Sequence, residues 1–237
     1  MARLAELWRV VGRGPTRRYV AGLAACALVL AAASTSMGGV VGSKHDFSSG
    51  NASAIWGTTS VDQVCIFCHT PHNATVSQML WNRNLPAANF KVYQSTTLNA
   101  AVGQPGQNSL MCLSCHDGTT AIDAFVRGRA GAPTMMAIGD VYYPGSPYGK
   151  GMNIGGNYAG NPNNNDLRDD HPVGFVYDAA LAGADGHLSD PATVNLPLYA
   201  GKLECATCHN PHGVAGVPKF LRQSNTASAL CVKCHVK

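Results

Sequence analysis

Apolar residues form one long run near the start of the chain and only short runs after it. Residues 19–33 are fifteen small or apolar residues in succession, and two arginines precede them. From residue 37 onwards, short apolar stretches are interrupted by Gly, Pro, Ser and Asn, which break both helical and strand periodicity. We therefore expect a mostly irregular fold with short α-helices and little β structure.

Five short elements are predicted after the long apolar run. They are helices over residues 60–69 and 108–116, helical turns over residues 74–81 and 119–126, and a strand over residues 90–93. Pro71 holds the residue before it in an extended conformation and so ends the first helix. Asn108 or Ser109 is expected to cap the second. The Gly-rich start of the mature chain predicts a mobile arm that carries His45, and residues 127–165 predict a long loop.

The composition leaves little material for a core made of protein alone. Charged residues are 13% and aromatic residues 7% of the chain, while Gly and Pro contribute 26 and 13 residues. The net charge of +4 arises in the first 18 residues, which hold five arginines and one acid, because the remainder has twelve bases and twelve acids. Since the remainder has no excess of bases, we expect no nucleic-acid partner.

One five-residue pattern, C-x-x-C-H, occurs four times. It spans residues 65–69, 112–116, 205–209 and 231–235, which we call motifs 1 to 4. This pattern attaches c-type haem, because its two thiols bond to the porphyrin and its histidine binds the iron. A structural zinc site uses pairs of cysteines but gives no reason for a histidine after every second cysteine. We therefore expect four covalent c-type haems, whose apolar surfaces form the core.

Eight of the nine cysteines are expected haem attachment points. They are Cys65, Cys68, Cys112, Cys115, Cys205, Cys208, Cys231 and Cys234. The ninth, Cys26, lies in the long apolar run.

The nine histidines suffice to give every iron two imidazole ligands. Those inside the motifs, the proximal ligands, are His69, His116, His209 and His235. The expected distal ligands, on the opposite face of each haem, are His45, His72, His171 and His212. His187 is set aside because residues 185–190 are typical of an exposed polar turn. An iron with two imidazoles has no open position for a substrate, so we expect electron transfer and no enzymatic activity.

Motifs 1 and 3 share a longer pattern, C-x-x-C-H-x-P-H. Each is followed by a plain motif, so the chain contains two copies of a two-haem unit, over about residues 45–130 and 166–237. We treat residues 37–237 as a single tetrahaem domain built from these two units. His72 lies three residues after His69 and cannot reach the opposite face of the same iron, so any iron that it binds belongs to another haem.

The first 36 residues are typical of a cleaved secretory signal peptide. A basic start is followed by the apolar run and then by small residues at positions 34–36. The run is shorter than the roughly 20 residues that span a bilayer as a helix. Lipidation at Cys26 and twin-arginine export are the alternatives to general secretion. The mature protein is therefore expected to be exported.

Several segments besides the motifs resemble the doubled C-x-x-C-H multihaem cytochromes. They are residues 45–46, 65–74, 80–82, 112–119 and 170–175, and residues 221–222 together with motif 4. Within that family the chain is most similar to the OmcE-type tetrahaem cytochromes, which polymerise into extracellular nanowires. The resemblance covers nearly all of residues 45–237.

The resemblance implies a homopolymeric filament with a continuous chain of haems, in which one distal histidine comes from the adjoining subunit. His45 is the first candidate donor because of its place on the N-terminal arm, and His72, His171 and His212 are the others. The resemblance also implies an extracellular or cell-surface location, with redox proteins or an extracellular electron acceptor as partners.

Two other functions remain open from the sequence. One is a monomeric periplasmic tetrahaem shuttle, whose four irons would all be ligated by a single chain. The other is a multihaem reductase, which needs an iron with an open position. The supply of histidines argues against the reductase.

Overall fold

The computed structural model describes residues 39–51, 61–87, 89–117, 126, 154 and 165–236. All of them belong to one compact unit, Gly39–Lys237. The expected signal peptide, most of the helical turn over residues 119–126 and most of the loop over residues 127–165 lie outside the described residues. Among the described helices, none has the length and apolar character needed to span a membrane.

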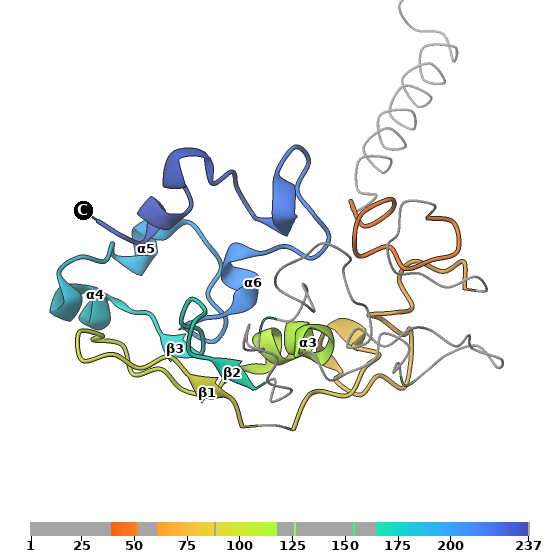
Figure 1. The fold of residues 1–237 in the computed structure, drawn as a ribbon, viewed down its shortest axis with the longest axis horizontal. Helices are drawn as coiled ribbons and strands as arrows, with labels where there is room; N and C mark the ends of the chain where they lie inside the picture. Colours follow the sequence, from red (N-terminus) through yellow and green to blue (C-terminus); the bar gives the residue numbers. More distant parts are fainter. Residues whose placement is uncertain are drawn as a thin grey trace, which may run out of the picture. The chain divides into compact units, whose positions relative to one another are not determined.

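Regular structure is sparse, as the sequence predicts. The helices are α3 (Gln107–His116), α4 (Ala179–Asp185), α5 (Pro191–Val194) and α6 (Cys205–Cys208). Single 3₁₀ turns are η2 (Gln78–Leu80), η4 (Pro218–Phe220), η5 (Thr226–Ser228) and η6 (Cys231–Lys233). The strands are β1 (Lys91–Val92), β2 (Asp166–Leu167), β3 (Phe175–Val176) and β4 (Lys202–Leu203). Figure 1 shows these elements as short pieces on a mostly irregular chain, which confirms the expected fold class.

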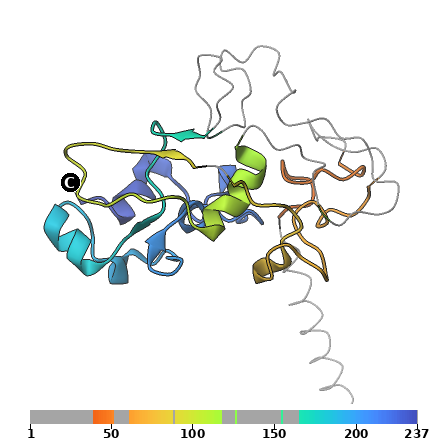
Figure 2. The same cartoon turned by 90° about the horizontal axis from the view of Figure 1, so that it is seen from below.

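The strands form two sheets of two strands each. β1 and β2 pair in parallel and lie side by side in Figure 2, whereas β3 and β4 pair antiparallel. Phe90, which precedes β1, exchanges two hydrogen bonds with the amide of Gln104, at 2.8 and 2.9 Å. The strand predicted over residues 90–93 is therefore confirmed, with its two central residues paired to β2.

The helix predicted at motif 2 is confirmed as α3, but its expected cap is wrong. The N-cap is Gly106, so Asn108 and Ser109 lie inside the first turn and are buried. Buried Met111 and Leu113 face the protein interior from the middle of the helix. The cap differs because a carboxylate from a distant segment binds the start of α3, as described below.

The helix predicted at motif 1 is absent, because residues 65–69 form a single turn. The helical turns expected over residues 74–81 shrink to η2, whose central residue, Met79, has a left-handed backbone with φ 62°. Local turn bonds, such as that from the N–H of His69 to the carbonyl of Cys65, are joined here by bonds between the two segments, such as that from the N–H of Thr70 to the carbonyl of Leu80.

Asp46 organises the N-terminal segment, so the mobile arm expected around His45 is wrong. One carboxylate oxygen accepts from the N–H (3.1 Å) and hydroxyl (2.5 Å) of Ser48, and the other accepts from the N–H of Gly42 (2.8 Å). Asn51 donates to the Asp46 carbonyl at 2.9 Å. Asp46, Phe47 and Ser48 are buried, so His45 is presented from a packed turn.

Three small apolar clusters contain most of the buried hydrophobic residues among those that the structure describes. They are Phe47, Val61 and Phe67; Phe175, Tyr177, Ala182, Val194 and Leu203; and Phe90, Leu113 and Leu167. Cys68 and Cys115 pack against the first cluster, and Cys234 packs against the second. The cysteines of the motifs thus lie where protein side chains alone form only small cores.

Candidate functional site

Motif 1 forms a turn that a later segment holds in place. The N–H of His69 donates to the carbonyl of Cys65 at 2.8 Å. Asn82, which is fully buried, binds the turn twice: its N–H donates to the carbonyl of Cys68 (2.9 Å) and its Nδ2 to that of Ile66 (2.7 Å). These bonds position the two thiols and the imidazole of the motif without a regular helix.

Motif 3 repeats this arrangement 140 positions later. Arg222, the counterpart of Asn82, donates from its N–H to the carbonyl of Cys208 (2.9 Å) and from Nε to that of Ala206 (2.7 Å). A guanidinium in one copy therefore does what an amide does in the other. The structure extends the repeat from the eight residues visible in the sequence to all of residues 205–222.

The histidine rings of motifs 1 and 3 are held by backbone carbonyls. Nδ1 of His69 lies 2.6 Å from the carbonyl oxygen of Met79, and Nδ1 of His209 lies 3.1 Å from that of Lys219. A carbonyl oxygen can only accept a hydrogen bond, so Nδ1 carries the proton and the lone pair of the neutral ring is on Nε2. Nε2 is therefore the nitrogen with which either ring could bind a metal.

Pairs of left-handed residues supply these carbonyls. The φ angles are 62° at Met79 and 51° at Leu80, and 59° at Lys219 and 56° at Phe220. Left-handed backbone costs roughly 1–2 kcal/mol for each residue that has a side chain. The sequence does not reveal these pairs, because none of the four residues is typical of such backbone. Their equal spacing after the two proximal histidines is the signal that could have found them.

Glu204 connects the helices of motifs 2 and 3. It is 2% exposed, and its carboxylate accepts from the N–H of Gly106 at 3.1 Å and from the hydroxyl of Ser109. The same hydroxyl accepts from the N–H of Cys205 at 2.9 Å. α3 and α6 consequently lie against each other (Figure 1). A hydrogen bond between the thiols raises the pKa of Cys112 and lowers that of Cys205.

Other motif cysteines are also neighbours across motifs. Burial, followed by the charge of Cys115, raises the pKa of Cys68 to about 12. Burial, followed by the charge of Cys234, raises the pKa of Cys208 to about 11. Thiols with such pKa values are protonated and weakly nucleophilic near neutral pH. Cys68 and Cys115 also pack against one apolar cluster, and the charge interaction places Cys208 near Cys234.

Motif 4 is joined to the segment around Leu188. The N–H of Ser189 donates to the carbonyl of Cys234 and the N–H of Val236 to that of His187, both at 2.8 Å. The side chain of His187 is exposed. This residue therefore contributes its backbone to the position of motif 4.

Three of the four proximal histidines face a second histidine ring. Ring centres are 6.0 Å apart for His69 and His212, 6.2 Å for His116 and His45, and 6.3 Å for His235 and His171. Two bonds of about 2 Å between a first-row metal and imidazole nitrogens, together with the radii of the two rings, separate ring centres by roughly 6 Å. The three pairs therefore fit a haem iron between two imidazoles.

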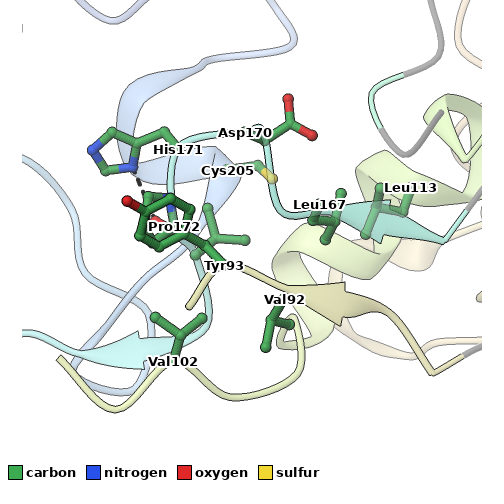
Figure 3. Close-up of a pocket in the computed structure, with 10 residues that line it drawn as sticks. Val92, Tyr93, Val102, Leu113, Leu167, Asp170, His171, Pro172 and Cys205 are labelled. Carbon is green, nitrogen blue, oxygen red and sulfur yellow. Dashed lines mark hydrogen bonds between the residues drawn. The ribbon is translucent and has the colours of Figure 1, made fainter. Parts of the chain in front are cut away.

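The distal rings of these pairs are prepared for metal binding. Nδ1 of His45 lies 3.2 Å from the carbonyl oxygen of Pro211, and Nδ1 of His171 lies 3.0 Å from that of Pro172, the dashed line in Figure 3. Both rings thus keep the lone pair on Nε2. Burial lowers the pKa of His45 and of His212, which favours the neutral, metal-binding form of each ring.

His209 and His72 are the two expected ligands that this chain leaves without a partner ring. The described residues include all nine histidines, and none of the others pairs its ring with that of His209 or His72. Both side chains are exposed. The fourth pair expected from the sequence is therefore not assembled within one copy.

A small pocket that is partly open to solvent lies beside Cys205 and His171. Figure 3 shows its mostly apolar lining, with Val92 from β1, Leu167 from β2 and Leu113 from α3. An apolar lining next to an attachment thiol suits contact with the edge of a flat apolar ring such as a porphyrin. The pocket, the thiols and the histidine pairs together fit covalently attached haem.

Comparison with known families finds a match at the C-terminal end of the chain. The family of the doubled CXXCH motif matches residues 197–237, which contain motifs 3 and 4. Among curated proteins, none matches the chain. The C-x-x-C-H motifs thus indicate covalently bound c-type haem.

Proposed function

We propose that this multihaem c-type cytochrome transfers electrons through four haems, each held between two histidines, as the subunit of an extracellular filament. The observation that carries the proposal is the 6.0–6.3 Å separation of three histidine ring pairs. Each pair combines a motif histidine with one from a distant part of the chain. This arrangement supports ligation of the iron from both faces.

The protein holds and orients the ligands of each iron. When bound, each haem takes up or releases a single electron with little rearrangement. The carbonyls of Met79 and Lys219 keep the proximal rings of motifs 1 and 3 in one tautomer and orientation. Since histidines would hold each iron from both faces, we propose no substrate site and no enzymatic activity.

Neighbouring cysteines support transfer from one haem to the next. The neighbouring pairs are Cys68 and Cys115, Cys112 and Cys205, and Cys208 and Cys234. These pairs connect motif 1 to 2, 2 to 3, and 3 to 4. Attachment at these thiols would bring the edges of successive porphyrins close together.

The internal repeat suggests the missing ligand of His209. His212 follows motif 3 and pairs with His69 of motif 1, at 6.0 Å between ring centres. His72 follows motif 1 and is the counterpart of His212 in the repeat. The equivalent partner of His72 is therefore His209 of motif 3. Because the chain does not form this pair within itself, we propose that it forms between two copies.

A bond from His72 of one copy to the iron at His209 of the next joins two different surfaces. Such head-to-tail contacts produce an open polymer when the rotation does not close a ring. Met79 and Leu80, on the same loop as His72, are 47% and 46% exposed and would be covered by the contact. His45, the first candidate from the sequence, is less suitable because its ring faces His116 of its own chain.

Export is part of the proposal. Covalent c-type haem is generally attached outside the cytoplasm, and residues 1–36 are typical of a signal peptide. The proposed partners are a redox protein that supplies electrons and a redox protein or extracellular acceptor that receives them. N-terminal sequencing of the secreted protein should find a start near residue 34 or 37.

The filament is tested by negative-stain electron microscopy of the secreted protein and of His72→Ala. Wild type should form filaments and carry four haems by mass spectrometry. The His72→Ala variant should remain as particles of subunit size, with one haem in four high-spin and able to bind carbon monoxide. His187→Ala is the matched control, because His187 is equally exposed but has no proposed iron; it should form filaments like wild type.

Three results would each contradict a part of this proposal. Filaments of His72→Ala equal to wild type would remove His72 as the shared ligand. Dispersed wild-type monomers with four low-spin haems would favour the periplasmic shuttle, and a high-spin haem in assembled wild type would favour a reductase.

A further inference from the structure

Arg83 carries a positive charge that no solvent reaches. Its side chain is fully buried. Nε donates to the carbonyl of Ser114 in α3 at 3.4 Å, and the guanidinium also forms a hydrogen bond with the thiol of Cys115. The charge therefore lies between the segment that follows motif 1 and the helix that carries motif 2.

Hydrogen bonds place Arg83 beside both motifs. Asn82, the residue before Arg83, donates to the carbonyls of Cys68 and Ile66 in motif 1. Ser114, whose carbonyl accepts from Nε of Arg83, directly precedes Cys115 in motif 2. The guanidinium is thus held between the segment that binds motif 1 and the second cysteine of motif 2.

The two copies of the repeat differ at this position. The counterpart of Arg83 is the neutral Gln223, whose amide donates to the carbonyl of Ala229. The guanidinium of the second copy belongs to Arg222, which is only partly buried and lies near Cys208. A fully buried charge shared by two motifs is therefore a property of the first unit.

We propose that Arg83 raises the reduction potentials of the haems attached at motifs 1 and 2. Reduction removes one positive charge from a haem iron, so a fixed positive charge nearby favours the reduced form. The inference rests on the proposed function, because it requires haems at Cys68 and Cys115. It assigns Arg83 to the tuning of electron affinity, with no direct bond to iron.

Spectroelectrochemical titration of the haem-loaded full chain tests the proposal. Arg83→Gln gives the first copy of the repeat the glutamine that the second copy has at the equivalent position, Gln223. Two of its four one-electron steps should become about tenfold less favourable for reduction, which is 59 mV for a one-electron couple. Arg83→Lys keeps the charge and should stay near wild type at neutral pH. Arg168→Gln removes an exposed arginine and should change no step.

Unchanged potentials in an Arg83→Gln protein with four low-spin haems would overturn the inference and leave the proposed function intact. Absence of haem from the wild-type protein would instead contradict the proposed function. If Arg83→Gln does not take up haem, Arg83→Lys decides, because a buried lysine loses its charge at alkaline pH and arginine does not. The reduction potentials of two steps should then fall with rising pH in Arg83→Lys relative to wild type. Potentials that change with pH in the same way in both proteins would overturn the inference.

Discussion

Left-handed residues near the proximal histidines connect backbone strain to ligand geometry. The carbonyl of Met79 accepts a hydrogen bond from Nδ1–H of His69, and the carbonyl of Leu80 accepts one from the N–H of Thr70 at 2.9 Å. Both carbonyls reach these donors because the two residues turn the chain with positive φ. Strain of this kind persists only where surrounding contacts over-determine the backbone. Here the contacts include the two bonds from Asn82.

Substitutions at Met79 should reveal this strain. Met79→Gly should raise the free energy of unfolding by up to about 1 kcal/mol, because relief of left-handed strain outweighs the added freedom of the unfolded chain. Met79→Val should lower it by about 1 kcal/mol, since a β-branched side chain fits positive φ poorly. Denaturant unfolding of the haem-loaded protein measures both. Changes of the same sign would argue against strain at this residue.

At the level of elements, one carboxylate joins helices that are distant in the sequence. Glu204 ends the segment before α6, yet it accepts the hydrogen bonds at the start of α3. Two motifs are therefore positioned relative to each other by a single side chain.

Glu204→Gln should destabilise the protein by about 1.5–3 kcal/mol, the range for hydrogen bonds to a buried charge. Urea titration measures the loss. Asp178→Asn is the comparison, because Asp178 caps the exposed start of α4 with one bond of 2.8 Å; it should cost about 1 kcal/mol or less. Equal losses would show that the contact between α3 and α6 does not depend on the carboxylate.

The sheet of β1 and β2 has an acid whose effect depends on pH. Arg168 binds both oxygens of Asp166, at 2.8 and 2.5 Å, and lowers the pKa of Asp166 from 3.8 to about 2. The folded state therefore prefers the ionised carboxylate. The stabilisation is fully present above pH 3.8 and is lost as the pH falls towards 2.

Asp166→Asn should accordingly lower the urea midpoint slightly at pH 5, and the difference from wild type should shrink at pH 3. High salt should reduce the effect, since the pair is exposed on the arginine side. A difference that is equal at both pH values would assign the effect to packing and not to charge.

At the scale of the whole molecule, a histidine of the second unit faces a motif histidine of the first. His212 of the second unit faces His69 of the first, and His45 faces His116 while its Nδ1 binds the Pro211 carbonyl next to His212. Neither half therefore contains all the ligands that we propose for its own haems.

His212→Ala should convert one haem in four to the high-spin form, measured by carbon monoxide binding and electron paramagnetic resonance. Combining it with Cys65→Ala and Cys68→Ala, which prevents attachment at motif 1, should remove that high-spin signal. A signal that persists in the combined variant would place His212 on another haem, in disagreement with the ring pair.

The order of residues along the chain determined the chemistry of the sites by itself. C-x-x-C-H places two thiols and an imidazole within one turn, so local spacing is enough to predict attachment. The short helix α3 and strand β1 could also be predicted from the sequence, because each depends on a few neighbouring residues. The mobile arm was predicted wrongly because its Gly and Ser content does not reveal the three bonds that Asp46 accepts.

Only the tertiary structure decided which histidines meet. His45 and His212 lie far along the chain from the proximal histidines that they face, and no periodic pattern specifies contacts across such long loops. The same holds for the burial of Arg83 between two motifs and for Glu204 at the start of α3. These contacts depend on how distant segments pack, so the partner of each ligand and the surroundings of each site required the fold.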